Sequence, residues 1–414
     1  DRIFCHKTGK LLPEPSPSAL SSLRQLTEYC YKLAFAFNDL QLKRAQDSYL
    51  ANQSSGSSFR PDPDWLNALR KSAETNYPYL FKAHAHEILA YGPRFGPGSF
   101  TNDPDRPGSD LPFYLWKRAP ISRVPSHDTC FNGFSGYFRP HRSIRVRNTS
   151  YAERRVATVL FVPKDSRGPR VISKEPPLIL NAQMAFFSWM TSLLQSNTLG
   201  RVQFENQHAN RMLAKTGSVD RRTATADLEK GSDRVWLHVC SAIFRNAPGI
   251  RFFLNRVRST HFKLPSGEVG VQNAVAGMGS GLTFPIMAFL IHLSVCTYVA
   301  RKYRLSYDRV ARHVYTFGDD LIIPTEWVTD AYHALSLVGL QVNTSKSYHK
   351  GPFRESCGGD YLNGVDVTPV RLRLANAGLP TDLGGKSLVL RSEMVSSKES
   401  FLVSLVAHRN ELFK

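Results

Sequence analysis

Closely spaced cysteines are missing from this sequence. Its six cysteines lie far apart, with no Cys-x-x-Cys pair and no histidine at zinc-ligand spacing. This excludes a disulfide scaffold and the common structural zinc sites. We therefore expect reduced, mostly buried thiols and an intracellular protein.

An apolar run long enough to span a membrane is also missing. The longest candidate, Pro285 to Ala300, is interrupted by His292 and Ser294, and it is shorter than the roughly 20 residues of a spanning helix. We interpret it as a core helix and expect no membrane partner. Because the chain begins with Asp1 and no signal segment follows, we expect a fragment or a processed product.

Acidic residues are scarce relative to basic ones. Thirty-four Asp and Glu stand against 53 Lys and Arg, which leaves a formal net charge of +19. Such a balance favours a polyanionic partner, either nucleic acid or an anionic membrane surface, although a merely soluble basic protein has the same composition. Hydrophobic residues at 42% and charged residues at 21% are ordinary for a globular protein, so disordered and collagen-like classes are excluded.

Residues 1–60 carry no catalytic pattern. A helical run is predicted around Leu26 to Arg44, and the Ser-rich segment Asn52 to Ser58 is typical of a flexible connector. Gly and Pro are frequent between Tyr91 and Pro112 and predict an irregular loop. Residues 139–174 contain ten Lys or Arg against two acids, interleaved with aromatic residues, a composition that suits RNA binding.

After residue 175, predicted strands and helices alternate. In order, they are a strand at Thr223–Ala226, a helix at Val235–Phe244 capped by Ser232 or Asp233, a Gly-rich loop at 277–281, a helix from about Thr283 to Tyr303, β-prone runs at His313–Phe317 and Leu321–Ile323, a helix at Val328–Val338 and a strand from Gln341 to Asn343. The two β-prone runs predict a hairpin with Gly318, Asp319 and Asp320 at its tip.

Carboxylates at this tip indicate a chemistry. Asp319 and Asp320, with Asp227 from a neighbouring strand end, could bind two divalent ions about 4 Å apart. Hard cations such as Mg²⁺ prefer oxygen ligands and also bind substrate phosphates, so carboxylates beside a basic surface favour phosphoryl transfer. The tripeptide Gly318-Asp319-Asp320 on its own is also compatible with a solvated, type I′-like hairpin turn without a catalytic role.

Several short motifs follow one another between residues 155 and 373. They are Arg170-x3-Lys174-Glu175-Pro176, Ala224-Thr225-Ala226-Asp227-Leu228 with Ser232-Asp233, Met278-Gly279-Ser280-Gly281-Leu282-Thr283-Phe284, Phe317-Gly318-Asp319-Asp320, Lys346, Phe353-Arg354-Glu355-Ser356-Cys357-Gly358 and Gly364-Val365-Asp366-Val367-Thr368-Pro369. This series resembles the motifs of viral RNA-dependent RNA polymerases, and most closely the replicases of RNA bacteriophages of the levivirus type. Narnavirus and mitovirus replicases are the nearest alternatives.

The resemblance implies an α+β right-hand polymerase fold of fingers, palm and thumb, with an antiparallel palm sheet flanked by helices. It divides the chain into an N-terminal extension and fingers (1–222), palm (223–246), a fingers insertion (247–270), palm (271–370) and the start of an incomplete thumb (371–414).

The resemblance also implies residue roles. Asp227 and Asp319 would ligate two Mg²⁺ ions, for which Mn²⁺ can substitute, with Asp320 as a closer or accessory ligand, and Lys346 would protonate the departing pyrophosphate. The cations expected along the nucleotide path are Lys164, Arg167, Arg170 and Lys174. The nucleotide role is favoured for Arg170 and Lys174, while a solvated basic strand or a contact with the template backbone is the alternative for all four.

Ribose recognition is expected at Asp233, which would sense the 2′-hydroxyl. Four residues after Thr283, where many polymerases offer an Asn to this Asp, the sequence has Met287, which cannot donate a hydrogen bond. Sugar selection would then rest on Asp233, Ser280 and Thr283. Gly279 and Gly281 would let the backbone flex or approach the template and product closely.

The resulting hypothesis is template-directed RNA synthesis from ribonucleoside triphosphates on single-stranded RNA, in the cytoplasm of an infected, bacterial host. The resemblance adds host translation factors and a ribosomal protein as partner subunits. Two alternatives stay open at this point. A reverse transcriptase commonly has a different residue before the paired aspartates than Gly318, and a non-catalytic RNA-binding or coat-type protein would explain the charge but not the three ordered aspartates.

Overall fold

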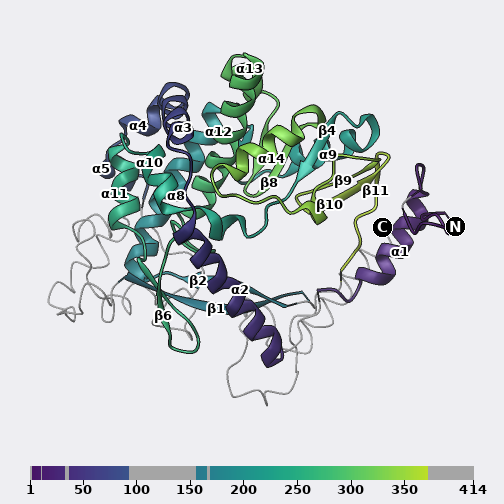
Figure 1. Ribbon diagram of the computed structural model, residues 1–414, viewed down its shortest axis with the longest axis horizontal. Coiled ribbons are helices and arrows are strands. Elements are labelled where there is room, and N and C mark those ends of the chain that lie inside the picture. The colour runs from purple at the N-terminus through teal and green to yellow at the C-terminus, as the bar shows by residue number, and fades with distance from the viewer. Residues whose placement is uncertain (1, 11, 33–36, 93–154, 166–167, 372–414) are drawn as a thin grey trace. The chain divides into compact units, whose positions relative to one another are not determined.

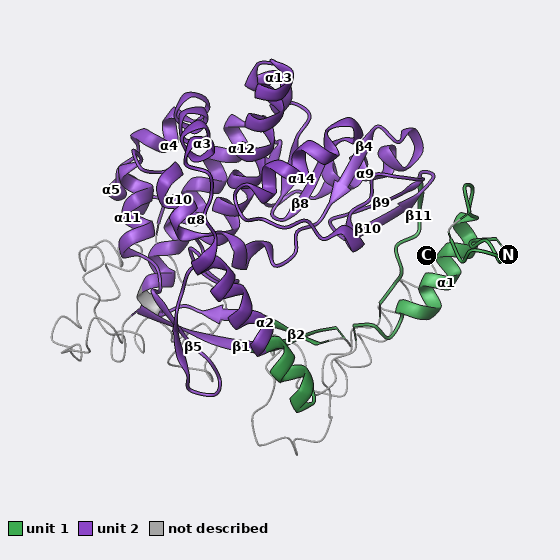
Figure 2. Cartoon of the chain, viewed as in Figure 1, with its two compact units in different colours: residues 1–45, 161–170, 365–414 green, residues 46–160, 171–364 purple. Residues whose placement is uncertain are grey.

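The structure, a computed structural model, describes residues 2–10, 12–32, 37–92, 155–165 and 168–371 (Figure 1). The chain forms two compact units (Figure 2). Unit 1 comprises residues 1–45, 161–170 and 365–414, and unit 2 comprises residues 46–160 and 171–364. The three aspartates and Lys346 all belong to unit 2. The predicted fingers, palm and thumb boundaries stay a prediction.

Helices make up most of the described elements. The α-helices are α1 (Pro17–Glu28), α2 (Asp39–Ser58), α3 (Pro63–Asn76), α4 (Pro78–Lys82), α5 (Ala85–Leu89), α8 (Pro177–Asn197), α9 (His208–Asp220), α10 (Leu237–Ile243), α11 (Pro248–Arg256), α12 (Thr283–Tyr303), α13 (Tyr307–Ala311) and α14 (Val328–Ser336). Short 3₁₀ turns are η4 (Gly231–Arg234), η5 (Thr325–Trp327) and η6 (Thr344–Lys346).

The strands are short. They are β1 (Val156–Asp165), β2 (Gly168–Lys174), β3 (Val202–Gln203), β4 (Thr223–Ala226), β5 (His261–Lys263), β6 (Val269–Val271), β7 (Tyr315–Phe317), β8 (Asp320–Pro324), β9 (Phe353–Ser356), β10 (Gly359–Leu362) and β11 (Val365–Asp366). One four-stranded sheet has the order β2-β1-β5-β6, and another has the order β3-β7-β8-β4. Mainly antiparallel sheets combined with separate helices make the α+β class that the sequence predicts.

Helix α12 forms the centre of the core of unit 2 and packs against α3, α8, α13 and α14. It matches the helix predicted from about Thr283 to Tyr303. By length and composition it is apolar enough to cross a membrane, but 83% of its most apolar window is buried inside the protein. This burial is what a core helix requires, because a solvent-facing helix would alternate polar and apolar faces.

The sheet β3-β7-β8-β4 lies on this core. Strand β8 pairs antiparallel with both β7 and β4, while β3 pairs with β7 in parallel. The side chains of Leu321, Ile322 and Ile323 in β8 are fully buried, as a central strand demands. The hairpin β9–β10 is attached to β4 by Arg354, whose buried guanidinium donates to the carbonyl of Thr223 at 2.6 Å.

Unit 1 contains α1, which Ser16 caps by accepting a hydrogen bond from the N–H of Ala19. Within this unit, the amide of Gln25 pairs with the backbone of Val370 at 2.8 and 3.0 Å. Segments far apart in the sequence are thus joined in unit 1 as well.

Three local predictions are wrong. The Ser-rich segment Asn52–Ser58 is the end of α2, not a connector, because its polar side chains find partners within unit 2. Neither Ser232 nor Asp233 caps the following helix, since both lie in the 3₁₀ turn η4 and α10 begins later, at Leu237. The predicted strand at 341–343 is reduced to a single bridge between Val342 and Leu228.

Two further predictions concern the first half of the chain. The run from Leu26 to Arg44 is not one helix, because α1 ends at Glu28 and α2 begins at Asp39. The irregular loop predicted from Tyr91 and much of the basic segment 139–174 lie outside the described residues.

Candidate active site

The register of two strands brings the predicted carboxylates together. Ala226 in β4 pairs with Leu321 in β8. One residue further, the antiparallel register sets Asp227 across from Asp320, and directly opposite residues in such a pair have Cβ atoms about 5 Å apart. Two aspartates nearly a hundred residues apart in the sequence therefore face each other at one end of the sheet.

The turn between β7 and β8 carries the third carboxylate, Asp319. Phe317 pairs with Asp320, so Gly318 and Asp319 form a two-residue loop. Gly318 has a φ of +62°, and Asp319 is not among the residues with positive φ. This pattern fits a type II′ turn rather than the type I′ turn that the sequence suggested. Glycine is required here, because a Cβ atom would overlap the ring of Phe284.

Electrostatics confirm that acidic side chains crowd this end of the sheet. Burial first, and then the charges of Glu355, Asp319 and Asp227, together raise the pKa of Asp320 to about 8. The backbone N–H of Cys357 donates to Asp320 Oδ2 at 3.2 Å, and a hydrogen bond with the Cys357 side chain lowers the pKa of Asp320. Carboxylates that raise one another's pKa in this way are typical of functional sites.

Sequence reasoning did not single out Glu355. It lies on β9, and burial first, then the charges of Asp360 and Asp227, together raise its pKa to about 7. The signal was present, since Glu355 lies within the Phe353–Gly358 segment quoted above. Only the attachment of β9 to β4 shows that this carboxylate faces the aspartates.

Lys346 is held against Asp227 by the backbone. The N–H of Asn343 donates to the carbonyl of Asp227 at 2.9 Å, and the N–H of Asp227 donates to Ser347 Oγ at 3.2 Å. Lys346 Nζ then lies 3.3 Å from Asp227 Oδ2, with 42% of the lysine side chain and 18% of the aspartate side chain exposed. The predicted proton donor and the predicted metal ligand are therefore direct neighbours.

The donor set suits hard divalent cations. Asp227, Asp319, Asp320 and Glu355 offer oxygen ligands only, and a cation would relieve their mutual repulsion. In the part of the chain that the structure describes, however, no three acidic, His or Cys side chains converge as ligands of one ion. Lys346 supplies the neutralising charge beside Asp227 instead.

The Gly-rich loop 277–281 is held by two neighbouring elements. Ser280 Oγ and the N–H of Gly281 both donate to Gln183 Oε1 of α8, at 2.9 and 3.2 Å, and Thr283 Oγ1 donates to the carbonyl of Ala276. Both predicted ribose-site hydroxyls thus also stabilise the loop. A Cβ on Gly279 would lie 2.6 Å from the carbonyl oxygen of Ser173, so the close approach seen at Gly279 is to β2. Contact of Gly279 and Gly281 with template stays a prediction.

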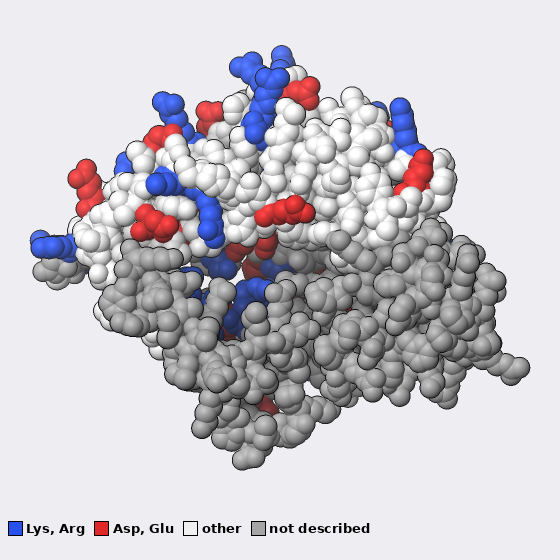
Figure 3. Space-filling model, turned by 180° about the vertical axis from the view of Figure 1, so that it is seen from behind, with Lys and Arg blue, Asp and Glu red and all other residues white. Residues whose placement is uncertain are grey.

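The predicted nucleotide-path cations are distributed unequally. Lys174 ends β2 next to Ser173, whose N–H donates to the carbonyl of Met278 in the Gly-rich loop at 2.7 Å. Lys164 and Arg170 belong to unit 1, and Arg167 lies outside the described residues. Figure 3 shows Lys and Arg side chains beside Asp and Glu side chains in a hollow of one face.

Asp233 lies in η4, and its carboxylate faces the Gly-rich loop. Burial raises its pKa to about 6, while Lys230 and the backbone N–H of Met278 oppose that rise. Its Oδ1 would lie 4.0 Å from a Cβ built on Gly277. Asp233 and the loop that contains Ser280 are therefore adjacent, as the ribose-site prediction requires.

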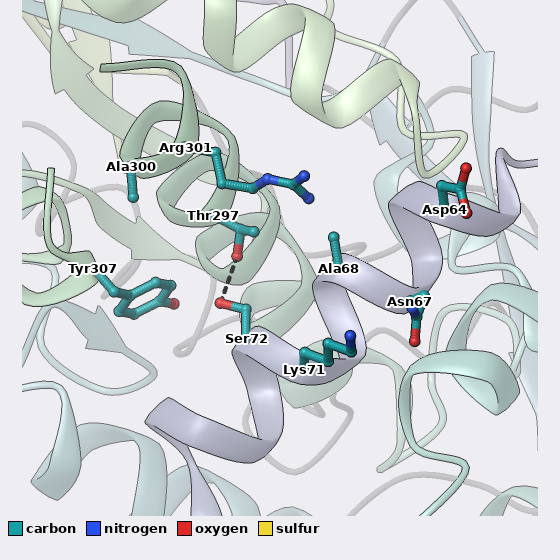
Figure 4. Close-up of a pocket in the computed structure, with 9 residues that line it drawn as sticks. All are labelled: Asp64, Asn67, Ala68, Lys71, Ser72, Thr297, Ala300, Arg301 and Tyr307. Atoms are coloured by element: carbon teal, nitrogen blue, oxygen red, sulfur yellow. Dashed lines mark hydrogen bonds between the residues drawn. The ribbon is translucent and has the colours of Figure 1, made fainter. Parts of the chain in front are cut away.

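A separate surface pocket of about 590 Å³ lies between α3, the end of α12 and α13 (Figure 4). It is lined by Asp64, Asn67, Ala68, Lys71, Ser72, Thr297, Ala300, Arg301 and Tyr307. Thr297 is 14 residues beyond Thr283 on α12, which is roughly 21 Å along the helix axis. The pocket is therefore not part of the carboxylate site.

Comparison with known proteins identifies the family. A family model described as RNA replicase, beta-chain matches residues 137–381, more than half of the chain. The chain belongs to this replicase family. The replicase chain is 32% identical over 236 residues to the RNA-directed RNA polymerase subunit beta of Escherichia virus Qbeta, covering 56% of this chain and 37% of that protein. It is 30% identical over 228 residues to the RNA-directed RNA polymerase beta chain of Escherichia phage MS2, covering 55% and 40%.

A solved structure shows the fold of the replicase chain. The RNA-dependent RNA polymerase of a human picobirnavirus matches with a TM-score of 0.54 at 12% sequence identity, covering 89% of this chain and 72% of that one. The replicase chain therefore has the right-hand polymerase fold that its motifs predicted. Its matches to the two phage proteins span well under half of their length.

Proposed function

We propose that this replicase chain catalyses template-directed RNA synthesis, by nucleotidyl transfer from ribonucleoside triphosphates onto an RNA 3′-hydroxyl, and so replicates a positive-strand RNA genome. The observation that carries the proposal is the β4–β8 register, which sets Asp227 across from Asp320 beside the Asp319 turn. A non-catalytic RNA-binding protein has no use for acidic groups crowded together in this way, because they repel phosphate.

The residues divide the work of the reaction. Asp227 and Asp319, with Asp320 and Glu355 beside them, would hold two Mg²⁺ or Mn²⁺ ions, which when bound lower the pKa of the attacking hydroxyl and stabilise the leaving pyrophosphate. Lys174 with Lys164, Arg167 and Arg170 would pair with the triphosphate. Lys346 would give its proton to the pyrophosphate, and Asp233 would accept a hydrogen bond from the ribose 2′-hydroxyl.

Partners and setting follow from the family. The Qbeta relative is named as a subunit, and we propose that this chain also works within a larger replicase, with host translation factors and a ribosomal protein as partners. Its template and product would be single-stranded RNA. The relatives come from bacterial viruses, so we propose the bacterial cytoplasm as its place of action.

The test is incorporation of labelled ribonucleotides on a single-stranded RNA template with Mg²⁺. Asp319→Ala should abolish synthesis, because the turn loses its carboxylate, while RNA binding persists or strengthens. Asp308→Ala, which removes an exposed carboxylate from α13, is the matched control and should leave both unchanged. Full synthesis by Asp319→Ala would refute the site, and a folded wild-type chain that binds RNA but makes no product with its partner subunits would favour the binding protein.

A further inference from the structure

Helix α2 presents a polar face to unit 2. Five of its residues share one side of the helix, because they are spaced by one, three or four positions, and we call them the α2 face: Ser48, Tyr49, Asn52, Gln53 and Gly56. Asn52 and Gln53 are only 3% and 4% exposed. A buried helix face made of amides and a glycine is unusual, since apolar side chains normally fill this role.

The α2 face contacts the segment that contains Asp233. Asn52 Nδ2 donates to the backbone carbonyl of Asp233 at 2.9 Å. Three residues before, Lys230 Nζ donates to the carbonyl of Ser48 at 3.0 Å. Three residues after, the ring of Trp236 packs so closely on Gly56 that a Cβ there would overlap it. The segment 230–236 is therefore fixed to α2 at both ends and at Asp233 itself.

The same face also contacts the strand end before the Gly-rich loop. Tyr49 Oη donates to Gln272 Oε1 at 3.1 Å, and Asn273 is bonded twice to Gln53, at 3.0 and 2.9 Å. Within the part of the chain that the structure describes, the Gln53 side chain makes no hydrogen bond to Asp233 or its neighbours. Two neighbouring residues of α2 thus contact different segments: Asn52 binds the Asp233 segment and Gln53 binds Asn273.

Two observations point beyond mere packing. Helix α12 offers no side-chain donor to this segment at position 287, because Met287 is buried there with its sulfur against Gly231. Asn52 Oδ1 and Gln53 Nε2 are both buried without a hydrogen-bond partner among the described residues, which costs stability at either position. What distinguishes Asn52 from Gln53 is therefore its hydrogen bond to the carbonyl of Asp233.

We propose that Asn52 is a positioning residue for Asp233, and that selection of ribonucleotides over deoxyribonucleotides depends on it. The inference rests on the proposed function, because it assigns a part of the same nucleotide site. The hydrogen bond from Asn52 restrains the backbone of Asp233 at its carbonyl group. This restraint would keep the Asp233 carboxylate oriented toward the Gly-rich loop. In this chain helix α2 provides this restraint through Asn52, whereas α12 contributes the apolar Met287 to the same segment.

The experiment compares kcat/KM for a ribonucleoside triphosphate with kcat/KM for its 2′-deoxy counterpart on one template. Asn52→Ala removes the amide, and Asn52→Asp keeps its shape but cannot donate the bond. Each should lower the selectivity ratio about fivefold, the worth of one hydrogen bond. Gln53→Ala is the matched control, equally buried on the same helix, and should lower the melting temperature while the ratio stays at the wild-type value.

The outcomes separate the two proposals. An unchanged ratio in either folded Asn52 variant overturns the positioning role, and so does an equal fall in Gln53→Ala, which would indicate general loosening of α2. If the wild-type chain synthesises no RNA, the selectivity ratio cannot be measured at all. That result would refute the proposed function and this inference together.

Discussion

Lys346 occupies a position that a metal ion would also seek. Its Nζ lies 3.3 Å from Asp227 Oδ2, in a group of carboxylates that repel one another. Without another cation, the ammonium partly neutralises this group. A divalent ion that binds Asp227 must compete with it, and the pair is exposed enough that we expect its contribution to lie within about 1 kcal/mol.

We therefore expect Lys346→Met to bind divalent ions two- to fivefold more tightly in the absence of nucleotide, while RNA synthesis slows because the proton donor is lost. Titration of Mn²⁺ followed by electron paramagnetic resonance measures the first effect without any turnover. Lys350→Met removes the same charge from an exposed neighbouring position and serves as control. Weaker metal binding by Lys346→Met would contradict the competition.

The membership of single residues in the candidate site could be predicted where adjacency in the sequence or simple strand pairing brings them together. Asp319 and Asp320 are adjacent at a glycine turn, and Asp227 ends a short β-prone run, so strand pairing alone sets them face to face. Glu355 could not be singled out in this way, because it reaches the site only through the attachment of β9 to β4 by Arg354. The expected N-cap role of Asp233 was wrong because Asp233 lies inside the 3₁₀ turn η4 and α10 begins only at Leu237.

At the scale of elements, α12 carries a buried titratable group outside the active site. His292 is 1% exposed, and its Nδ1 lies 2.9 Å from Tyr77 Oη. Burial lowers the pKa of His292 to about 4. In the unfolded chain the imidazole has its ordinary pKa near 6.5. Between pH 6.5 and 4, His292 is therefore protonated in the unfolded state but neutral in the folded state.

The free energy of unfolding should therefore fall as the pH drops from 6.5 towards 4, with about 2 kcal/mol lost by pH 5 through this residue. His292→Gln removes the titration and should show a correspondingly flatter dependence. Urea unfolding at pH 7, 6 and 5 measures the difference between the two proteins, with the exposed His333→Gln as control. Parallel pH dependences of wild type and His292→Gln would show that His292 does not titrate in this way.

Helices and strands could be predicted from the sequence where their buried faces consist of apolar side chains. The pattern of α12 and of the β7–β8 hairpin is unambiguous because hydrophobic periodicity reports apolar burial directly. Helix α2 was missed at its C-terminal end, since Ser, Gly and Asn favour loops by local propensity. There, tertiary hydrogen bonds and the close contact of Gly56 with Trp236 outweigh that preference.

For the molecule as a whole, we expect the net charge of +19 to govern the strength of RNA binding. Ten basic residues lie in segment 139–174 of the sequence, whereas Asp227, Asp319, Asp320 and Glu355 belong to unit 2. The residues expected to attract an RNA backbone and the clustered carboxylates thus come from different segments of the chain.

RNA affinity should consequently fall linearly with salt on logarithmic axes. Each neutralised phosphate of a single strand contributes about 0.7 to the slope, so six contacts would lower the affinity roughly 300-fold between 50 and 200 mM salt. Fluorescence anisotropy with labelled RNA measures this slope. An affinity that does not change with salt would contradict the electrostatic account, and a steeper slope in Asp319→Ala would show that the metal site also contacts phosphate.

The contact between Gly318 and Phe284 limits how this sequence can vary. The Gly318–Asp319 turn lies against the aromatic ring that follows Thr283, and there is no room between them for a single added carbon. Because Gly318 also has a φ of +62°, a smaller side chain at 284 would relieve the overlap but not the backbone strain. Glycine would therefore still be favoured at 318 after a change at 284, 34 positions earlier in the chain.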